Sequence, residues 1–87
     1  MKVPKMMVLV ESGAVREVEA TPDAAGGWTV WIVYRHRDGE RREALERQRG
    51  GVRVFATLDA VARAIADAGL SAFRVSVGDL DARKEPL

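Results

Sequence analysis

The sequence predicts an α+β fold, in which an antiparallel β-sheet of about five to six strands carries a single α-helix packed on one face. The clearest strand lies over residues 28–36 (WTVWIVYRH), where β-branched and aromatic residues occupy both faces, as is typical of a central strand. The clearest helix follows Thr57, a favourable N-cap, and has apolar residues at helical spacing. A helix with one apolar face needs a sheet to cover that face.

Length and composition indicate one small folded domain. Of the 87 residues, 47% are apolar and 31% are charged. We expect the domain to span residues 1–87, with an ordered core from about residue 5 to residue 78 and a flexible tail over residues 79–87. Cysteine is absent, which excludes disulfides and thiolate chemistry. The apolar run Met6–Val10 is shorter than the h-region of a signal peptide, and no run approaches the roughly 18 residues of a membrane span, so we expect a cytoplasmic protein without membrane contact.

The first two predicted strands lie before residue 21. The apolar run Met6–Val10 suits a short buried strand, and the turn residues that follow it favour a hairpin with a second strand over Val15–Ala20. Alternation along the second strand places Val15 on the same face as Glu17 and Glu19. This strand is expected to be partly exposed.

The central strand is followed by a tight turn and a charged strand. Asp38-Gly39 is a strong hairpin signal, because a tight reversal requires a positive φ that glycine adopts easily. The chain then returns over Arg41–Arg47. One face of the central strand carries Trp28, Val30, Ile32 and Tyr34. The other face carries Thr29, Trp31, Val33 and Arg35.

The C-terminal half supplies a fifth strand, the helix and a last strand. A glycine turn at residues 49–51 precedes the short strand Val52–Ala56, and Gly69 ends the helix. Alternation over residues 72–77 predicts the last strand. The predicted apolar stripe of the helix consists of Leu58, Val61, Ala62, Ile65 and Ala66. We expect this stripe to cover the Trp28 face of the central strand and to leave the Trp31 face open.

Catalytic and metal-binding patterns are missing from the sequence. His36 is the one histidine, no serine lies in a nucleophile motif, and no glycine-rich phosphate loop is present. Carboxylates and histidine do not cluster at metal-ligand spacing. We therefore expect a protein that is not an enzyme, with no catalytic residues, no metal, no cofactor and no small-molecule substrate.

An excess of arginine marks the middle of the chain. Residues 35–53 contain seven arginines and four acidic residues, whereas the segments on either side are slightly acidic. Contacts with nucleic-acid phosphates depend on such a local excess, and an exposed tryptophan can stack on bases. The candidate interaction or nucleic-acid-binding residues are Trp31, Val33, Arg35, Arg37, Arg42, Arg49 and Arg53.

Three interpretations of this surface remain open. It could bind DNA, it could bind another protein or a second copy of the chain as a homodimer, or it could be an inert solvated face. In the last case Glu40, Glu43 and Glu46 would pair with arginines across strands. High-GC codon usage alone would also enrich arginine over lysine.

The segment from Gly27 to Gly69 has a recognisable order of features: a tryptophan opening a strand, a D-G-x-R turn, a charged strand, and G-x-x-R-x-F-A-T-L-D-A before a helix. This order resembles DNA-binding domains of the AP2 type and the arm-binding domains of phage integrases. The resemblance implies that the sheet enters the major groove and that Arg35, Arg37, Arg42 and Arg53 face DNA.

A longer pattern runs through most of the chain: VLVESGAVREVEA, then WIVYRHRDG, then QRGGVRVFATLDAVAR. This succession resembles small partition-associated (ParC-like) proteins of bacterial plasmids and integrative elements. The resemblance implies an accessory role in plasmid maintenance or partition. Together with the residue patterns it favours a non-enzymatic interaction module that acts through the open sheet face, with a DNA-binding module as the alternative.

Overall fold

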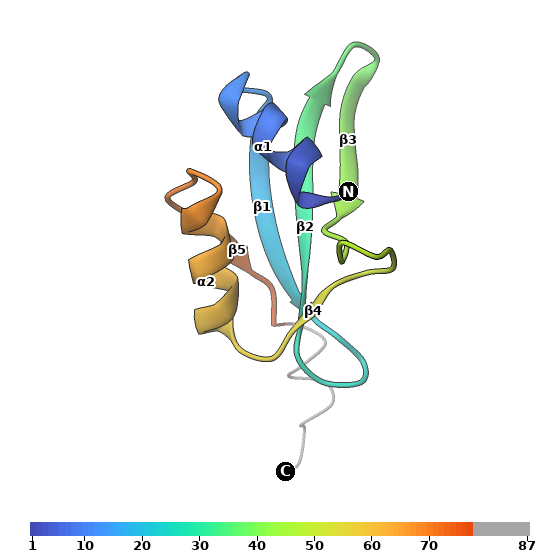
Figure 1. The fold of residues 1–87 in the computed structure, drawn as a ribbon, viewed down its shortest axis with the longest axis vertical. Helices are drawn as coiled ribbons and strands as arrows, with labels where there is room; N and C mark the ends of the chain where they lie inside the picture. Colours follow the sequence, from blue (N-terminus) through green and yellow to red (C-terminus); the bar gives the residue numbers. More distant parts are fainter. Residues whose placement is uncertain (78–87) are drawn as a thin grey trace.

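The computed structural model describes residues 1–77, which form one sheet with helices on one face (Figure 1). The elements of this part of the chain are α1 (Val3–Glu11), β1 (Val15–Pro22), β2 (Trp28–His36), β3 (Gly39–Ala44), β4 (Val54–Phe55), α2 (Leu58–Asp67) and β5 (Arg74–Val75). The predicted α+β class is confirmed, and the sheet of the described residues has five strands. The tail predicted over residues 79–87 lies outside the described residues.

The strand order within residues 1–77 is β3-β2-β1-β5, and β4 pairs with β2 on the β3 side. The pairs that β2 makes with β1, β3 and β4 are antiparallel, as predicted, but β5 runs parallel to β1. The expectation of a purely antiparallel sheet is therefore wrong. Since β4 and β5 point the same way with β2 and β1 between them, the chain must cross over the sheet, and α2 makes this crossover.

The prediction of a strand over Met6–Val10 is wrong, because this segment belongs to the helix α1. Pro4 in the first turn has a φ suited to a helix start, and Met6 packs into the core. A short apolar run fits a buried strand or a buried helix equally well, so periodicity could not decide between them. The described chain consequently has two helices where one was expected, and β1 pairs with β2 and β5 instead. Neither helix of residues 1–77 is long and apolar enough to cross a membrane.

A register irregularity near the start of β1 changes which side chains face the core. The pairing with β2 shifts between Val15 and Glu17, so that Val15 lies opposite Tyr34 and packs against the core. Simple alternation predicted the opposite face for Val15. An extra residue in one strand reverses the alternation beyond it. The neighbouring Arg16 forms an ion pair with Glu40, with 3.7 Å between a guanidinium nitrogen and a carboxylate oxygen.

The core lies between the sheet and both helices. The predicted partition of the β2 faces is confirmed, because Val30, Ile32 and Tyr34 are buried on the helix side. Met1 is also buried, so the core extends ahead of its predicted start near residue 5. The buried apolar residues are Met1, Met6, Val18, Ala20, Val30, Ile32, Tyr34, Leu45, Phe55, Val61, Ile65 and Ala68.

The helix α2 begins and ends as predicted, but its apolar stripe is rotated. The Thr57 hydroxyl accepts a hydrogen bond from a backbone N–H of the first turn at 3.1 Å, which caps the helix. Ala62 and Ala66 were expected in the core and are exposed. Ala68 is buried and Ala64 is half-buried against the core instead. Alanine is small enough to occur on either face, so the spacing of alanines is a weak guide to helix orientation.

A polar cluster fastens α1 to the edge of the sheet. The Tyr34 hydroxyl donates a hydrogen bond to the Glu43 carboxylate, and Lys5 Nζ lies 3.2 Å from Glu43 and 3.3 Å from the Tyr34 oxygen. The Met1 ammonium lies 2.9 Å from the Glu46 carboxylate. The hydrogen bond from Tyr34, aided by Lys5, lowers the pKa of Glu43, and hydrogen bonds to Tyr34 and Glu43 raise the pKa of Lys5.

Truncation of the α2 stripe should destabilise the fold. Ile65→Ala removes a side chain that is 2% exposed, so we expect a loss of about 2–5 kcal/mol in the free energy of unfolding, measured by urea denaturation. Val8→Ala is the matched control, because Val8 is 63% exposed and its truncation should cost about 0.5 kcal/mol or less. Equal losses in the two variants would contradict the placement of α2.

The α1 cluster should make stability depend on acid pH. Because folding lowers the pKa of Glu43 below its ordinary 4.5, the carboxylate stabilises the fold fully above that value and ceases to do so as the pH falls through the folded-state pKa. We expect Glu43→Gln to be less stable than the natural chain at neutral pH, and the difference to shrink as the pH is lowered. Urea denaturation across this pH range measures it. A difference independent of pH would show that packing, and not charge, is responsible.

Candidate functional site on the open sheet face

One face of the sheet is left uncovered, because both helices pack on the other face (Figure 1). Strands β1, β2 and β3 supply this open face. Their register places Glu19 and Ala44 on either side of Trp31, and Glu17 and Arg42 on either side of Val33. The open face thus has an apolar centre on β2 and charged side chains on both flanking strands.

Trp31 is held in one position at the centre of the open face. Its indole N–H donates a hydrogen bond to the Thr21 hydroxyl at 3.2 Å. The Arg42 guanidinium carbon lies 4.0 Å from the ring centroid, and the same guanidinium lies 3.3 Å from the Glu19 carboxylate. A cation stacked on an indole is attracted by the ring quadrupole. Arg42 therefore occupies a ring face that a nucleic-acid base would need for stacking.

A shallow hollow adjoins this arrangement. It measures about 440 Å³ and is bordered by Trp31, Arg42, Ala44 and Val52, among others. Val52 itself is 49% exposed although it is a large apolar residue. The half-buried edge of Trp31 and the exposed Val52 together provide an apolar contact area next to a fixed guanidinium.

Cross-strand ion pairs neutralise much of the charge on the open face. Arg42 pairs with Glu19 at 3.3 Å, and Arg74 pairs with Glu17 at 2.9 Å. Such exposed pairs contribute about 0–1 kcal/mol each to stability. Their consequence for binding is larger, because carboxylates on the same face repel phosphates and hold the guanidinium groups.

Of the three glutamates in the arginine-rich segment, one has an arginine partner and two have other partners. Glu40 pairs with an arginine, as one interpretation of the sequence proposed, although the partner Arg16 comes from β1. Glu43 and Glu46 pair with amino groups at the start of the chain instead. The excess of arginine in residues 35–53 is therefore only partly balanced within that segment.

The candidate residues do not all gather on one surface. Trp31, Val33, Arg35 and Arg42 lie on the open face, while Arg37 lies in the β2–β3 turn and Arg49 in the turn before β4, both exposed. Arg53 lies on the helix side, where its guanidinium carbon is 4.3 Å from the centroid of the Phe55 ring. The reason is alternation: Phe55 packs into the core, and Arg53, two residues earlier, points the same way.

Some arginine side chains remain free for a partner. Within residues 1–77, Arg35, Arg37 and Arg49 make no ion pair and no side-chain hydrogen bond. Arg35 and Arg37 lie at the β2–β3 end of the sheet, and Arg49 lies in a separate turn. The free cations thus form no single continuous strip.

The sequence pattern did not identify Thr21, Glu17 and Glu19 as parts of this site. They reach Trp31 and its neighbours only through the pairing of β1 with β2. Their side chains alternate along β1, which signals a polar strand face, but the irregularity at the start of β1 prevents the register from being deduced from alternation alone.

No group of three histidine, aspartate or glutamate side chains within residues 1–77 is arranged to hold a metal ion. Comparison of the chain with protein-family models, curated protein sequences and solved structures finds no match.

Removal of the Arg42 side chain should expose the Trp31 ring. In a Trp28→Phe background, where Trp31 is the one fluorophore of its kind, Arg42→Ala should increase the acrylamide quenching of Trp31. Arg41→Ala is the matched control, because Arg41 lies 3.8 Å from Asp38 and takes no part in the stacking. Unchanged quenching in Arg42→Ala would contradict the stacked arrangement.

Proposed function

We propose that this protein is a non-enzymatic accessory module that binds another protein, or a second copy of itself, through the open face of its sheet. The observation that carries the proposal is the Trp31 indole, fixed by Thr21 and Arg42 at the centre of an uncovered sheet face. Tryptophan and arginine are enriched among the residues that dominate protein interfaces. Side chains that are already ordered lose less conformational entropy on binding.

The charge pattern favours a protein partner over DNA. Glu17 and Glu19 lie on the same face as Trp31, and Glu19 is paired with Arg42, one of the arginines that DNA binding would require. Interfaces between proteins accommodate mixed charges at their rim around an apolar centre. A phosphate-binding surface instead needs an excess of free cations.

The resemblance to partition-associated plasmid proteins supports a setting for this binding. In that setting the protein is an accessory factor of a bacterial mobile element, acting in plasmid maintenance or partition in the cytoplasm.

DNA binding is the second candidate, and the free arginines Arg35 and Arg37 at the β2–β3 end favour it. Their position matches what the AP2 and integrase-arm resemblance implies for a sheet that enters a groove. Arg53 does not fit this scheme, because it lies on the other side of the sheet from Arg42.

Photo-crosslinking tests the protein-binding proposal. A photoreactive amino acid at Val33, on the open face, should capture a protein partner in the native host, and Trp31→Ala should abolish the capture. The same probe at Ala62, on the exposed side of α2, should capture no such partner. Sedimentation velocity of the purified protein shows whether the partner is a second copy. Capture that is insensitive to Trp31→Ala would contradict the proposal.

Titration of a labelled mixed-sequence duplex, followed by fluorescence anisotropy, tests the alternative. We expect no saturable binding at about 50 or 200 mM salt, a range over which phosphate-driven binding weakens strongly. Saturable, salt-sensitive binding would support the DNA alternative, and Arg35→Ala and Arg37→Ala should then each reduce the salt slope by about one.

A further inference from the structure

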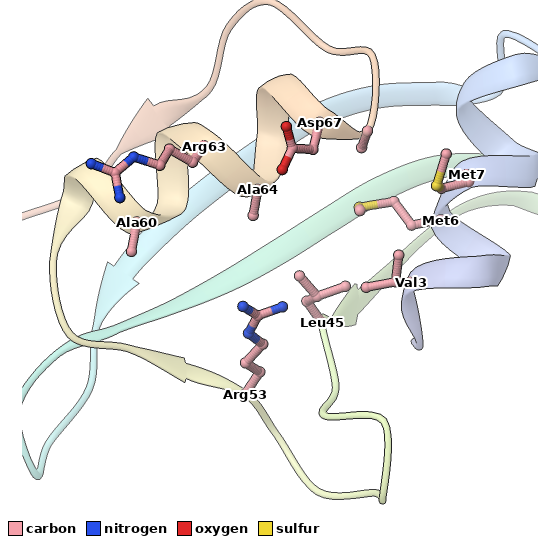
Figure 2. A pocket seen from close by; sticks show the side chains of 10 residues that line it. Val3, Met6, Met7, Leu45, Arg53, Ala60, Arg63, Ala64 and Asp67 are labelled. Atoms are coloured by element: carbon pink, nitrogen blue, oxygen red, sulfur yellow. The ribbon is translucent and has the colours of Figure 1, made fainter.

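The helix side of the sheet contains a groove that the two helices leave between them. One hollow of about 360 Å³ lies between α1, α2 and Leu45, and a second of about 470 Å³ lies beside the start of α1. Val3 and Arg53 border both hollows, so the two hollows are adjacent, and together they are here called the helix groove. Figure 2 shows Arg53 and Leu45 rising from below, with α2 on one side and Met6 and Met7 of α1 on the other.

The helix groove between α1 and α2 is lined mainly by apolar side chains, and those on α2 are short. On α2 the groove is lined by Ala60, Ala64 and Ala68, which are four residues apart and so share one side of the helix. Because alanine side chains are short, a bound segment can approach the α2 backbone closely. On α1 the groove is lined by Met6 and by Met7, which is 39% exposed. Methionine adapts its shape to different partners.

The rim of the helix groove is cationic. Among residues 1–77, its four basic side chains make no ion pair with a carboxylate: Lys2, Arg47, Arg53 and Arg63. Two acidic side chains also line the groove. The Glu46 carboxylate is paired with the Met1 ammonium at 2.9 Å. Asp67 is then the one remaining acidic side chain of the lining beside four basic side chains.

We propose that the helix groove binds a segment of a partner protein that is amphipathic and acidic, with apolar side chains along one face and carboxylates beside them. An amphipathic helix laid into an apolar groove is a common mode of peptide recognition. The apolar walls accommodate the apolar face of such a segment, and the unpaired cations complement its carboxylates.

A second copy of this chain fits the groove poorly. Helix α1 carries one acid, Glu11, and α2 carries Arg63 between Asp59 and Asp67. Neither described helix offers a row of carboxylates beside a free apolar face. The groove also lies on the opposite side of the sheet from Trp31, so this surface is separate from the one on which the proposed function rests.

Selection from a random peptide library displayed on phage, with the full chain as bait, tests the proposal. Enriched peptides should combine several aspartates or glutamates with apolar residues at helical spacing. For the synthesised peptides, Arg53→Glu and Ala64→Tyr should each weaken the measured Kd by about tenfold or more, through charge repulsion and steric block respectively.

Matched variants separate the groove from other surfaces. Arg37→Glu makes the same charge change at the β2–β3 turn, and Ala62→Tyr makes the same size change on the exposed side of α2, so both should leave Kd within about twofold. Trp31→Ala should also leave peptide binding unchanged, whereas it should abolish binding through the open face. Circular dichroism checks that each variant is folded.

Three outcomes would overturn the proposal. The first is that the enriched peptides lack acidic residues. The second is that the peptides bind the Arg53→Glu and Ala64→Tyr variants as tightly as the natural chain. The third is that selection on the natural chain enriches no peptide relative to selection on the Arg53→Glu variant. A dimer in sedimentation that Ala64→Tyr dissociates would assign the groove to a second copy and would likewise overturn it.

Discussion

Burial of the helix side of β2, together with its pairing along both edges, is the constraint on which the rest of this structure depends. The strand pairs with β1 on one side and with β3 and β4 on the other. Its helix-side residues Val30 and Ile32 are fully buried, and Thr29 on the other face is 7% exposed. Because β2 takes part in every antiparallel ladder of the described chain, its position determines where each neighbouring side chain points.

The two faces of the sheet follow from the way the chain covers β2. The crossover from β4 to β5 requires a connection over one face, and α2 supplies it. The short helix α1 covers the remaining part of the same face and is held by Glu43 and Glu46. Both helices therefore lie on one side, which leaves the half-buried Trp31 uncovered by a helix on the other side and a groove where the helices do not meet.

Charge is distributed differently on these two surfaces. On the open face, carboxylates from β1 hold Arg42 and Arg74. Along the helix groove, Arg53 and Arg63 have no carboxylate partner within residues 1–77. The arginine-rich composition therefore has two structural consequences: an ordered, nearly balanced face around a tryptophan, and a cationic rim around the helix groove. This difference supports two kinds of protein contact on opposite sides of one small sheet.

Sequence by itself determined the parts that depend on local chemistry. The residues of β2, the Asp38-Gly39 turn and the capped start of α2 follow from propensities and turn requirements within a few neighbouring residues. Tertiary structure alone decided the helical state of Met6–Val10, the shifted register at Val15, the parallel direction of β5 and the side of the sheet on which Arg53 lies. These features depend on which distant segments pack together, and a short apolar run or an alternating strand is compatible with more than one such packing.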